Sequence, residues 1–136
     1  MLLNKSLVIL IAVAFLAGCN SRPEVAQVSG IVLYPDGSVP QGGVCAVRFE
    51  PTADSTTELR KGASGAIQED GTFKLSTRKP GDGVYLGEYA VTFAVWKGPR
   101  DPTSLIKDIY TNASTSPYKV VVDGDIEDLK FEIEPK

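Results

Sequence analysis

The chain has no histidine, and it has only two cysteines, one methionine and one tryptophan among its 136 residues. Histidine is the commonest general base near neutral pH and a common ligand of zinc, so its absence excludes enzymes and zinc sites that depend on it. No serine lies in a Gly-x-Ser-x-Gly nucleophile motif. We therefore expect a protein that is not an enzyme and that holds no metal or cofactor.

Long hydrophobic runs are also scarce, and the one near the start is short. Residues 7–17 are apolar, follow Lys5 and end in the sequence Leu16-Ala17-Gly18-Cys19. The run is too short to span a bilayer, and a basic residue, a short apolar stretch and small residues in this order are typical of a secretory signal. The cysteine directly after Ala17-Gly18 indicates a bacterial lipobox. We expect a lipoprotein signal peptide over residues 1–18, cleaved between Gly18 and Cys19.

Lipidation of Cys19 would fix the location of the protein. A thioether-linked diacylglycerol and an N-acyl chain such as palmitate together anchor durably, whereas one chain binds a membrane only marginally. Asn20, in place of aspartate, favours the outer membrane where the familiar sorting rule applies. The alternative is an ordinary signal peptide cut near Ala17, which leaves Cys19 without a role.

Excess positive charge is absent as well. The chain carries 14 basic and 17 acidic side chains, and Lys5 is the only one of them that precedes Cys19. An acidic exported domain gives no reason to expect nucleic acid as a partner. With Cys19 lipidated, Cys45 has no cysteine to pair with, so no intramolecular disulfide is expected and Cys45 is interpreted as a small buried side chain.

Alternating apolar and polar residues, separated by turn residues, dominate the rest of the sequence. We expect a tether over residues 19–27 and a single domain over residues 28–136. The alternation predicts strands at 28–34, 43–50, 63–68, 72–77, 87–96, 118–122 and 129–133. The strand 87–96 is the longest and is expected at the centre of a sheet, and strands 63–68 and 72–77 are expected to form a hairpin. No segment after Cys19 has a helical period, so the fold class is all-β, an antiparallel β-sandwich of about seven strands.

Aspartate-glycine pairs begin at Asp36, Asp70, Asp82 and Asp123. Their spacing does not match a calcium-binding loop, and tight turns favour the same residues, so we interpret them as turns. The acidic run of Asp123, Asp125, Glu127 and Asp128 is interpreted as a solvated loop. The glycosylation sequon Asn112-Ala113-Ser114 is interpreted as chance behind a bacterial signal peptide.

One candidate ligand patch stands out. Residues 97–117 contain three prolines and little periodicity, which predicts a long loop of the kind that often carries a binding function. Trp96 precedes this loop, and Lys97, Arg100 and Tyr110 lie within it. An aromatic ring with polar neighbours at the edge of a sandwich could stack on a sugar. The alternative is that Trp96 caps the core beneath its own loop.

Several motifs resemble one known family. They are Val28-Ser29-Gly30-Ile31-Val32, Pro40-Gln41-Gly42-Gly43-Val44, Phe49-Glu50-Pro51, the stretch from Asp70 to Thr77, Pro80-Gly81-Asp82-Gly83, Gly87-Glu88-Tyr89-Ala90-Val91-Thr92, Tyr110 and Ser116-Pro117. With these the chain resembles the carboxypeptidase regulatory-like domain, more narrowly the small lipoproteins of this type in planctomycete-like bacteria. Asp36-Gly37-Ser38-Val39-Pro40 and Ile67-Gln68-Glu69 depart from the family pattern. The resemblance implies a transthyretin-like sandwich with an accessory role, and it transfers no catalytic residue.

These observations together predict a non-enzymatic, lipid-anchored protein of the cell envelope, whose sandwich is a binding or structural module. Two alternatives stay open. The domain could bind glycans for polysaccharide capture, or it could be an accessory subunit that docks on an envelope transporter or enzyme through an edge strand.

Overall fold

The computed structural model describes residues 24–53 and 60–136. The expected signal peptide and Cys19 lie outside the described residues. Within those two ranges no helix is long and apolar enough to cross a membrane. The elements are β1 (Val25–Ala26), β2 (Val28–Leu33), β3 (Val44–Pro51), β4 (Ala63–Ala66), β5 (Thr72–Lys74), β6 (Val84–Tyr85), β7 (Gly87–Gly98), β8 (Asp101–Ser104), the 3-10 helix η1 (Asp108–Tyr110), β9 (Lys119–Val122) and β10 (Ile126–Glu132).

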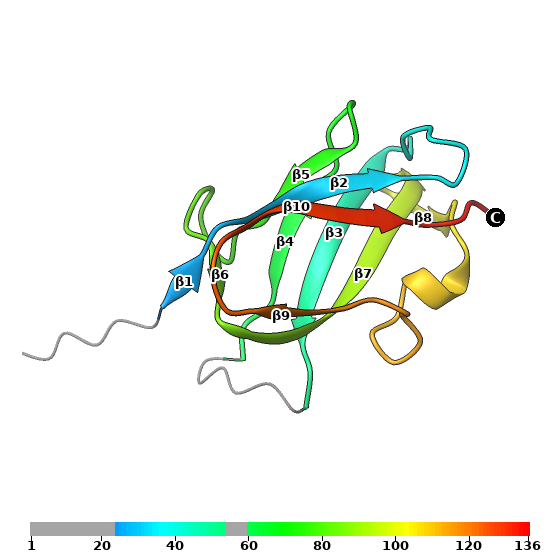
Figure 1. The fold of residues 1–136 in the computed structure, drawn as a ribbon. Coiled ribbons are helices and arrows are strands. Elements are labelled where there is room, and N and C mark those ends of the chain that lie inside the picture. The colour runs from blue at the N-terminus through cyan, green and yellow to red at the C-terminus, as the bar shows by residue number, and fades with distance from the viewer. Residues whose placement is uncertain (1–23, 54–59) are drawn as a thin grey trace, which may run out of the picture.

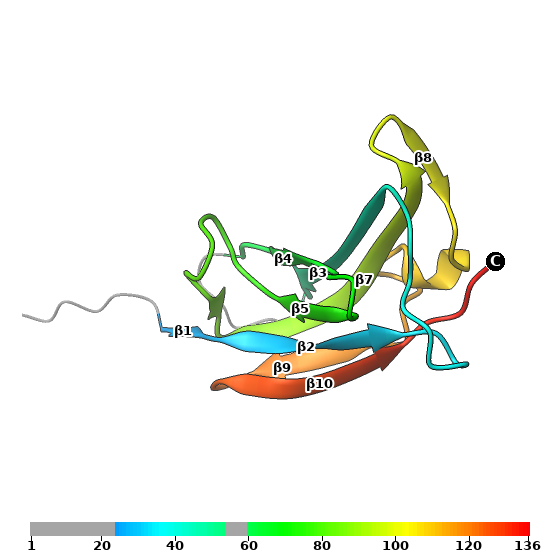
Figure 2. The same cartoon turned by 90° about the horizontal axis from the view of Figure 1, so that it is seen from above.

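Two sheets pack face to face, as Figures 1 and 2 show. The larger sheet has the order β4-β3-β7-β8, with β9 also paired to β7, and the smaller has the order β10-β2-β5. The predicted all-β sandwich is therefore confirmed. One pair differs from the antiparallel expectation, because β2 and β10 run parallel, with Gly30 opposite Leu129. A parallel pair needs a long connection, and these two strands are separated by most of the domain.

The strand β7 lies at the centre of the larger sheet, as predicted. It pairs with β3 along one edge and with β9 and β8 along the other. Tyr89, Val91, Phe93 and Val95 alternate along it and are at most 2% exposed. The intervening Ala90, Thr92 and Ala94 are also buried. They are small, and the long side chain of Arg48 extends over this outer face to Trp96.

The core between the sheets is centred on one aromatic ring. Phe131, on β10, packs against rings from the larger sheet, from β5 and from the segment before β9. Its ring centroid lies 5.1 to 6.5 Å from those of Phe49, Phe73, Phe93 and Tyr118. Edge-to-face and stacked rings at this spacing add to the free energy gained by burial alone.

The predicted hairpin of residues 63–68 and 72–77 is present in part, at its turn and at one antiparallel bridge. Strand β4 pairs with β3 in the larger sheet, whereas β5 pairs with β2 in the smaller one. One antiparallel bridge, between Ser64 and Ser76, joins the two segments directly. The tight turn between them is real, because the Gln68 N–H donates to the Thr72 carbonyl. The alternation identified both strands, but it could not identify their partners.

The fold also begins earlier than predicted. Residues 25–27 were assigned to the tether, yet β1 pairs with β6 and Ala26 is buried. The Gln27 N–H donates to the Asp125 carboxylate, 2.8 Å away. A two-residue strand is too short to show alternation, so the sequence pattern did not reveal it.

The segment 97–117 is more regular than the loop we expected. Strand β7 continues to Gly98 and forms a hairpin with β8, and η1 follows. Pro99 and Pro102 flank the hairpin tip, so the prolines that predicted a loop instead mark a turn and an edge strand.

The aspartate turns have a common geometry. Asp36, Asp70 and Asp101 each accept hydrogen bonds from the backbone N–H and the hydroxyl of the residue two positions later, and Asn112 does the same with Ser114. Asp82 instead accepts from the backbone N–H groups of Thr77, Arg78 and Lys79. These bonds favour the ionised carboxylate and lower the pKa of Asp82.

One seam of the sandwich is closed by a side chain. No strand ladder joins β9 and β10 in the described residues, although the two strands follow one another and lie in different sheets. The Tyr118 hydroxyl, just before β9, donates to the Glu132 carbonyl at 2.5 Å and accepts from the Glu132 N–H at 3.4 Å.

Replacing Tyr118 with phenylalanine should therefore weaken this seam. We expect the free energy of unfolding to fall by about 1 kcal/mol, the usual net value of such a hydrogen bond, in urea denaturation. Tyr85→Phe is the matched control, because its hydroxyl bonds to no other described residue. Equal stability of Tyr118→Phe and the parent would contradict a role for this bond.

The lowered pKa of Asp82 predicts a dependence of stability on pH. The hydrogen-bonded Asp82 carboxylate contributes fully to the free energy of unfolding when the pH is above 3.8, the ordinary pKa of an aspartate. This contribution is lost as the pH falls through the lowered pKa, because the unfolded chain then binds the proton more tightly. We expect Asp82→Asn to be less stable than the parent at pH 7 and to approach it at pH 2.5 in urea denaturation. Asp128→Asn removes a carboxylate that has no hydrogen bond in the described residues, so it should leave the free energy of unfolding unchanged at both pH values.

Candidate functional site

The predicted ligand patch does not assemble as a unit. Trp96 lies on the outer face of the larger sheet, opposite Val44, and the Arg48 guanidinium lies 5.9 Å from its ring centroid. Trp96 is partly exposed there and does not cap the core. The sequence pattern missed Arg48, because residues 48 and 96 become neighbours only through the register of β3 on β7.

The other three residues of the patch lie elsewhere. Tyr110, in η1, is buried on the inner side of the sheet, and its ring centroid lies 6.4 Å from those of Phe93 and Tyr118. Burial raises the pKa of the Tyr110 hydroxyl, and the nearby Glu134 carboxylate raises it further. Lys97 and Arg100 are exposed at the β7–β8 turn. Tyr110 is therefore a core residue, and Trp96 lies on the surface without the aromatic partner that the sequence pattern predicted for it.

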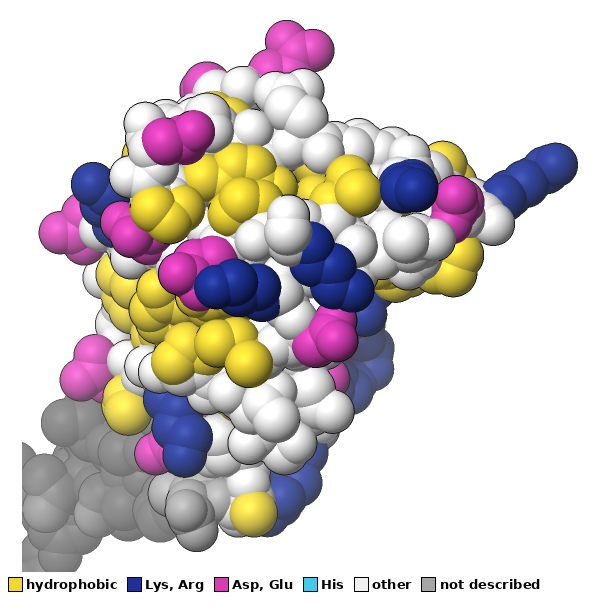
Figure 3. Space-filling view, turned by 90° about the vertical axis from the view of Figure 1, so that its right-hand side faces the viewer, with side chains coloured by type: hydrophobic (Ala, Val, Ile, Leu, Met, Phe, Trp, Pro, Cys, Tyr) yellow, Lys and Arg dark blue, Asp and Glu magenta, His cyan; other side chains and the backbone are white. Residues whose placement is uncertain are grey.

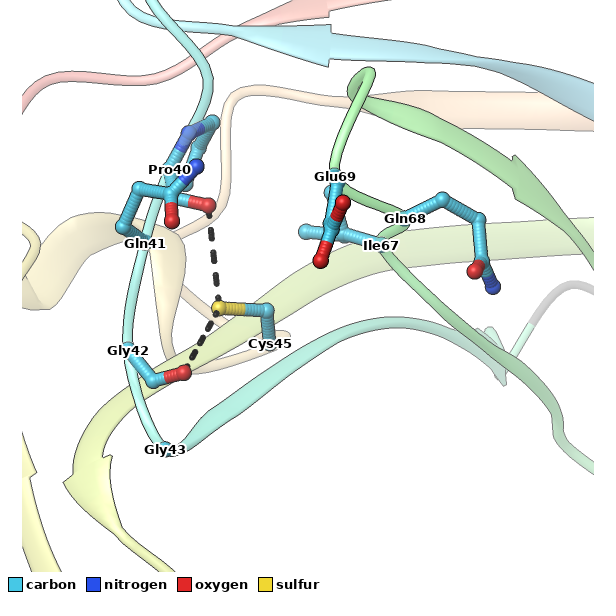
Figure 4. A pocket seen from close by; sticks show the side chains of 8 residues that line it. All are labelled: Pro40, Gln41, Gly42, Gly43, Cys45, Ile67, Gln68 and Glu69. Atoms are coloured by element: carbon cyan, nitrogen blue, oxygen red, sulfur yellow. Dashed lines mark hydrogen bonds between the residues drawn. The ribbon is translucent and has the colours of Figure 1, made fainter.

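A second candidate site is a pocket of about 310 Å³ at the loop end of the sandwich, shown in Figure 4. Its two walls are the segment that precedes β3 and the segment that follows β4, and Cys45 lies between them. The lining residues are Pro40, Gln41, Gly42, Gly43, Cys45, Ile67, Gln68 and Glu69.

Close backbone packing holds the first wall in place. The Gly43 N–H donates to the carbonyls of Trp96 and Lys97 at 2.9 and 3.2 Å. A Cβ atom on Gly42 would lie 2.5 Å from the Trp96 carbonyl oxygen, and one on Gly43 would lie 2.4 Å from the Gly98 Cα. Only glycine permits this approach, so the Gly42-Gly43 pair fixes the wall against β7.

The second wall is held by a hydrogen bond and a tight turn. The Ile67 N–H donates to the Cys45 carbonyl, and the Gly71 N–H donates to the Gln68 carbonyl, both at 2.9 Å. Gly71 has a φ of 86°, which a side chain would strain. Both walls are therefore fixed by backbone contacts, to which the buried side chains of Pro40 and Ile67 add.

The thiol between the walls is not suited to nucleophilic chemistry. Cys45 is half-buried and packs against the core, as the interpretation of a small buried side chain expects. Its Sγ lies 3.7 and 3.8 Å from the carbonyl oxygens of Pro40 and Gly42, as a weak donor. Burial raises the pKa of the thiol above 9.0, so it stays protonated at neutral pH.

Polar groups without internal partners surround the pocket. None of the hydrogen bonds among the described residues uses the side chain of Gln41, Gln68 or Glu69. Figure 4 shows the Glu69 carboxylate above the gap between the walls, whereas the Gln68 side chain leans away from Cys45. The lining contains no lysine or arginine, so it offers donors and acceptors but no positive charge.

No metal centre is present in the ranges 24–53 and 60–136, where no group of three or more Cys, Asp or Glu residues could hold an ion. Asp125, in the acidic run, binds the Gln27 N–H instead. In Figure 3 the basic, acidic and hydrophobic side chains are interspersed on the face at the right of Figure 1, and neither charge forms a continuous field there.

The glycine wall leads to a prediction about stability. Gly43→Ala should lower the free energy of unfolding by about 1–3 kcal/mol, because the added methyl group overlaps the Gly98 backbone. Gly98→Ala places its methyl group in open space and should change stability by less than about 1 kcal/mol. Urea denaturation of both variants compares them, and equal values would contradict the close packing of this wall.

Comparisons with known proteins give a structural likeness but no family. No family model matches the chain, and no curated protein matches it. Among solved structures, a DUF3823 family protein from Parabacteroides merdae ATCC 43184 is similar, with a TM-score of 0.48 and 18% identity. The match covers 84% of this chain and 48% of that protein, so the chain spans about half of its length.

Proposed function

We propose that the chain is a non-enzymatic lipoprotein of the bacterial cell envelope, anchored through lipid on Cys19, with the β-sandwich as a binding module. The observation that carries this proposal is the lipobox, which is followed almost at once by the folded domain. Strand β1 begins at Val25, six residues after Cys19. An extended chain of that length spans at most about 22 Å, so an anchored Cys19 would keep the domain next to the bilayer.

The chemistry of the described residues supports a role without catalysis. The thiol at the pocket is held protonated, and one carboxylate, that of Glu69, lies beside it. General acid–base chemistry of the glycosidase kind requires two carboxylates, and nucleophilic chemistry requires an activated group. The pocket offers neither, but it offers hydrogen-bonding groups on two fixed walls.

The arrangement of the ends supports a binding role away from the membrane. Figures 1 and 2 place β1 and β6 at one end of the molecule and β8, η1 and the C-terminus at the other. The Gln27 amide donates to the Gly81 carbonyl, so the loop before β6 also lies at the β1 end. Lipid on Cys19 would hold this end at the membrane and leave the pocket facing away from it.

We further propose that the domain is a carboxypeptidase regulatory-like domain of the planctomycete lipoprotein type, and that Asn20 directs it to the outer membrane. The two-sheet architecture supports the first assignment. The family-like motifs also have structural tasks here, since Gly42-Gly43 packs on β7 and Asp70-Gly71 forms the turn between the sheets.

Two of the described edge strands, β8 and β10, are poorly suited to docking by strand addition. Pro102 leaves the edge strand β8 without one N–H donor. On the edge strand β10, the Glu132 carbonyl already accepts a hydrogen bond from the Tyr118 hydroxyl. Both features obstruct an added strand. Glycan binding is thus the second candidate function, and the polar pocket is the observation that favours it.

Mass spectrometry of the membrane-extracted protein tests the anchor. We expect an N-terminal peptide that starts at Cys19 and carries diacylglycerol and an acyl chain. Cys19→Ala should move the protein to the soluble fraction, whereas Cys45→Ala should leave it with the membrane. An unmodified N-terminus, or membrane association of Cys19→Ala equal to that of the parent, would refute the proposal.

A further inference from the structure

We infer that the pocket between residues 40–43 and 67–69 binds one ring of a neutral carbohydrate. This inference rests on the proposed role as a binding module and names the site and the ligand class. It places the site in the pocket and not at Trp96, the residue that the sequence pattern favours.

The size of the pocket limits the ligand to a small molecule. Its volume of about 310 Å³ lies at the lower end of the range of roughly 300–1,000 Å³ that is usual for small-molecule sites. A shallower depression adjoins it and shares Gln68 and Glu69, and it is also lined by Asp70 and Thr72. A single ring fits the deeper pocket, and the next unit of a chain would lie over the depression.

The hydrogen-bonding groups of the pocket select for hydroxyls. The backbone N–H groups of Gln41 and Gly42 donate to no described residue, and the Pro40 and Gly42 carbonyls accept only the long contacts from the Cys45 thiol. The Gln41 amide adds both a donor and an acceptor, and Glu69 adds an acceptor. A hydroxyl group both donates and accepts, so a polyhydroxyl ring can satisfy this mixture.

Other ligand classes satisfy fewer of these groups. An ammonium ion only donates, and it would leave the N–H groups of Gln41 and Gly42 unpaired. A phosphate or carboxylate would meet the Glu69 charge with no lysine or arginine in the lining to offset it. An acyl chain would meet mostly polar groups, because the two large apolar residues of the lining, Pro40 and Ile67, are themselves buried. Of these classes, a neutral sugar satisfies the most groups of the pocket.

The walls are already in place before a ligand binds. Gly42 and Gly43 lie against the backbone of β7, and the turn from Gln68 to Thr72 is closed by backbone hydrogen bonds. Little backbone entropy is then lost on binding, which favours recognition of a small ligand with few contacts.

Nuclear magnetic resonance titration of the full-length lipoprotein in phosphocholine micelles tests this inference, because maltoside detergents carry sugars themselves. The probes are glucose, galactose, mannose and N-acetylglucosamine, with glucose 6-phosphate and ethanolamine as charged comparisons. We expect saturable shifts of the Gln41, Gly42 and Glu69 amides with at least one neutral sugar. Glu69→Ala should weaken that binding about tenfold, the loss of one charge-assisted hydrogen bond, and Glu127→Ala on β10 should not.

Three results would overturn the inference. The first is the absence of a saturable shift with every neutral sugar up to about 100 mM, a concentration that detects even millimolar affinity. The second is stronger binding of glucose 6-phosphate or ethanolamine than of any neutral sugar. The third is a set of shifts confined to the face of Arg48 and Trp96. If the protein carries lipid on Cys19 but binds no neutral sugar, this inference is refuted and the proposed lipid anchor is not. Sugar binding by a chain with an unmodified N-terminus would support this inference and refute the anchor alone.

Discussion

The contact of the Phe131 ring with the surrounding aromatic rings is the interaction on which the sandwich depends. Phe131 comes from β10, and its neighbours Phe49 and Phe93 come from the opposite sheet. The parallel pairing of β10 with β2 places this ring between the sheets, because it joins the end of the domain to its beginning. Tyr118 then serves twice, packing its ring on Phe131 and closing the seam with its hydroxyl.

The fixed core allows the connecting segments to carry the site. The wall at residues 40–43 is held by β7, which is itself centred over the core, and the opposite wall is held through Cys45 on β3. The pocket is therefore a consequence of how two connections leave the larger sheet. Its chemistry comes from backbone groups and from exposed side chains that have no structural task of their own, such as those of Gln41 and Glu69.

Local pattern in the sequence was sufficient for the strands and turns but not for the partners. Alternation identified the segments of β2, β3, β4, β5, β7, β9 and β10, and it also identified the inward side of β7. It could not show that β4 and β5, which one bridge joins, form their longer ladders with β3 and β2 in different sheets. The pattern missed β1, β6 and β8, because the first two have only two residues each and β8 contains a proline.

The candidate site was harder to predict for the same reason. The pairing of Arg48 with Trp96 depends on register, and the pocket joins segments some 25 residues apart in sequence. The Gly42-Gly43 pair was visible as a motif, but its close approach to β7 requires the fold. The sequence pattern groups Tyr110 with Trp96 in one ligand patch. In the structure η1 places the Tyr110 ring on the inner side of the sheet, against Phe93.

We propose that a rigid sandwich, anchored at its β1 end through lipid on Cys19, presents its pocket away from the bilayer. Fluorescent labels at Lys79→Cys and Glu69→Cys, in a Cys45→Ala background of the lipidated protein, report the two ends in vesicles that contain spin-labelled lipids. The account predicts strong quenching of the label at residue 79 and little quenching of the label at residue 69. Equal quenching, or stronger quenching at residue 69, would contradict it.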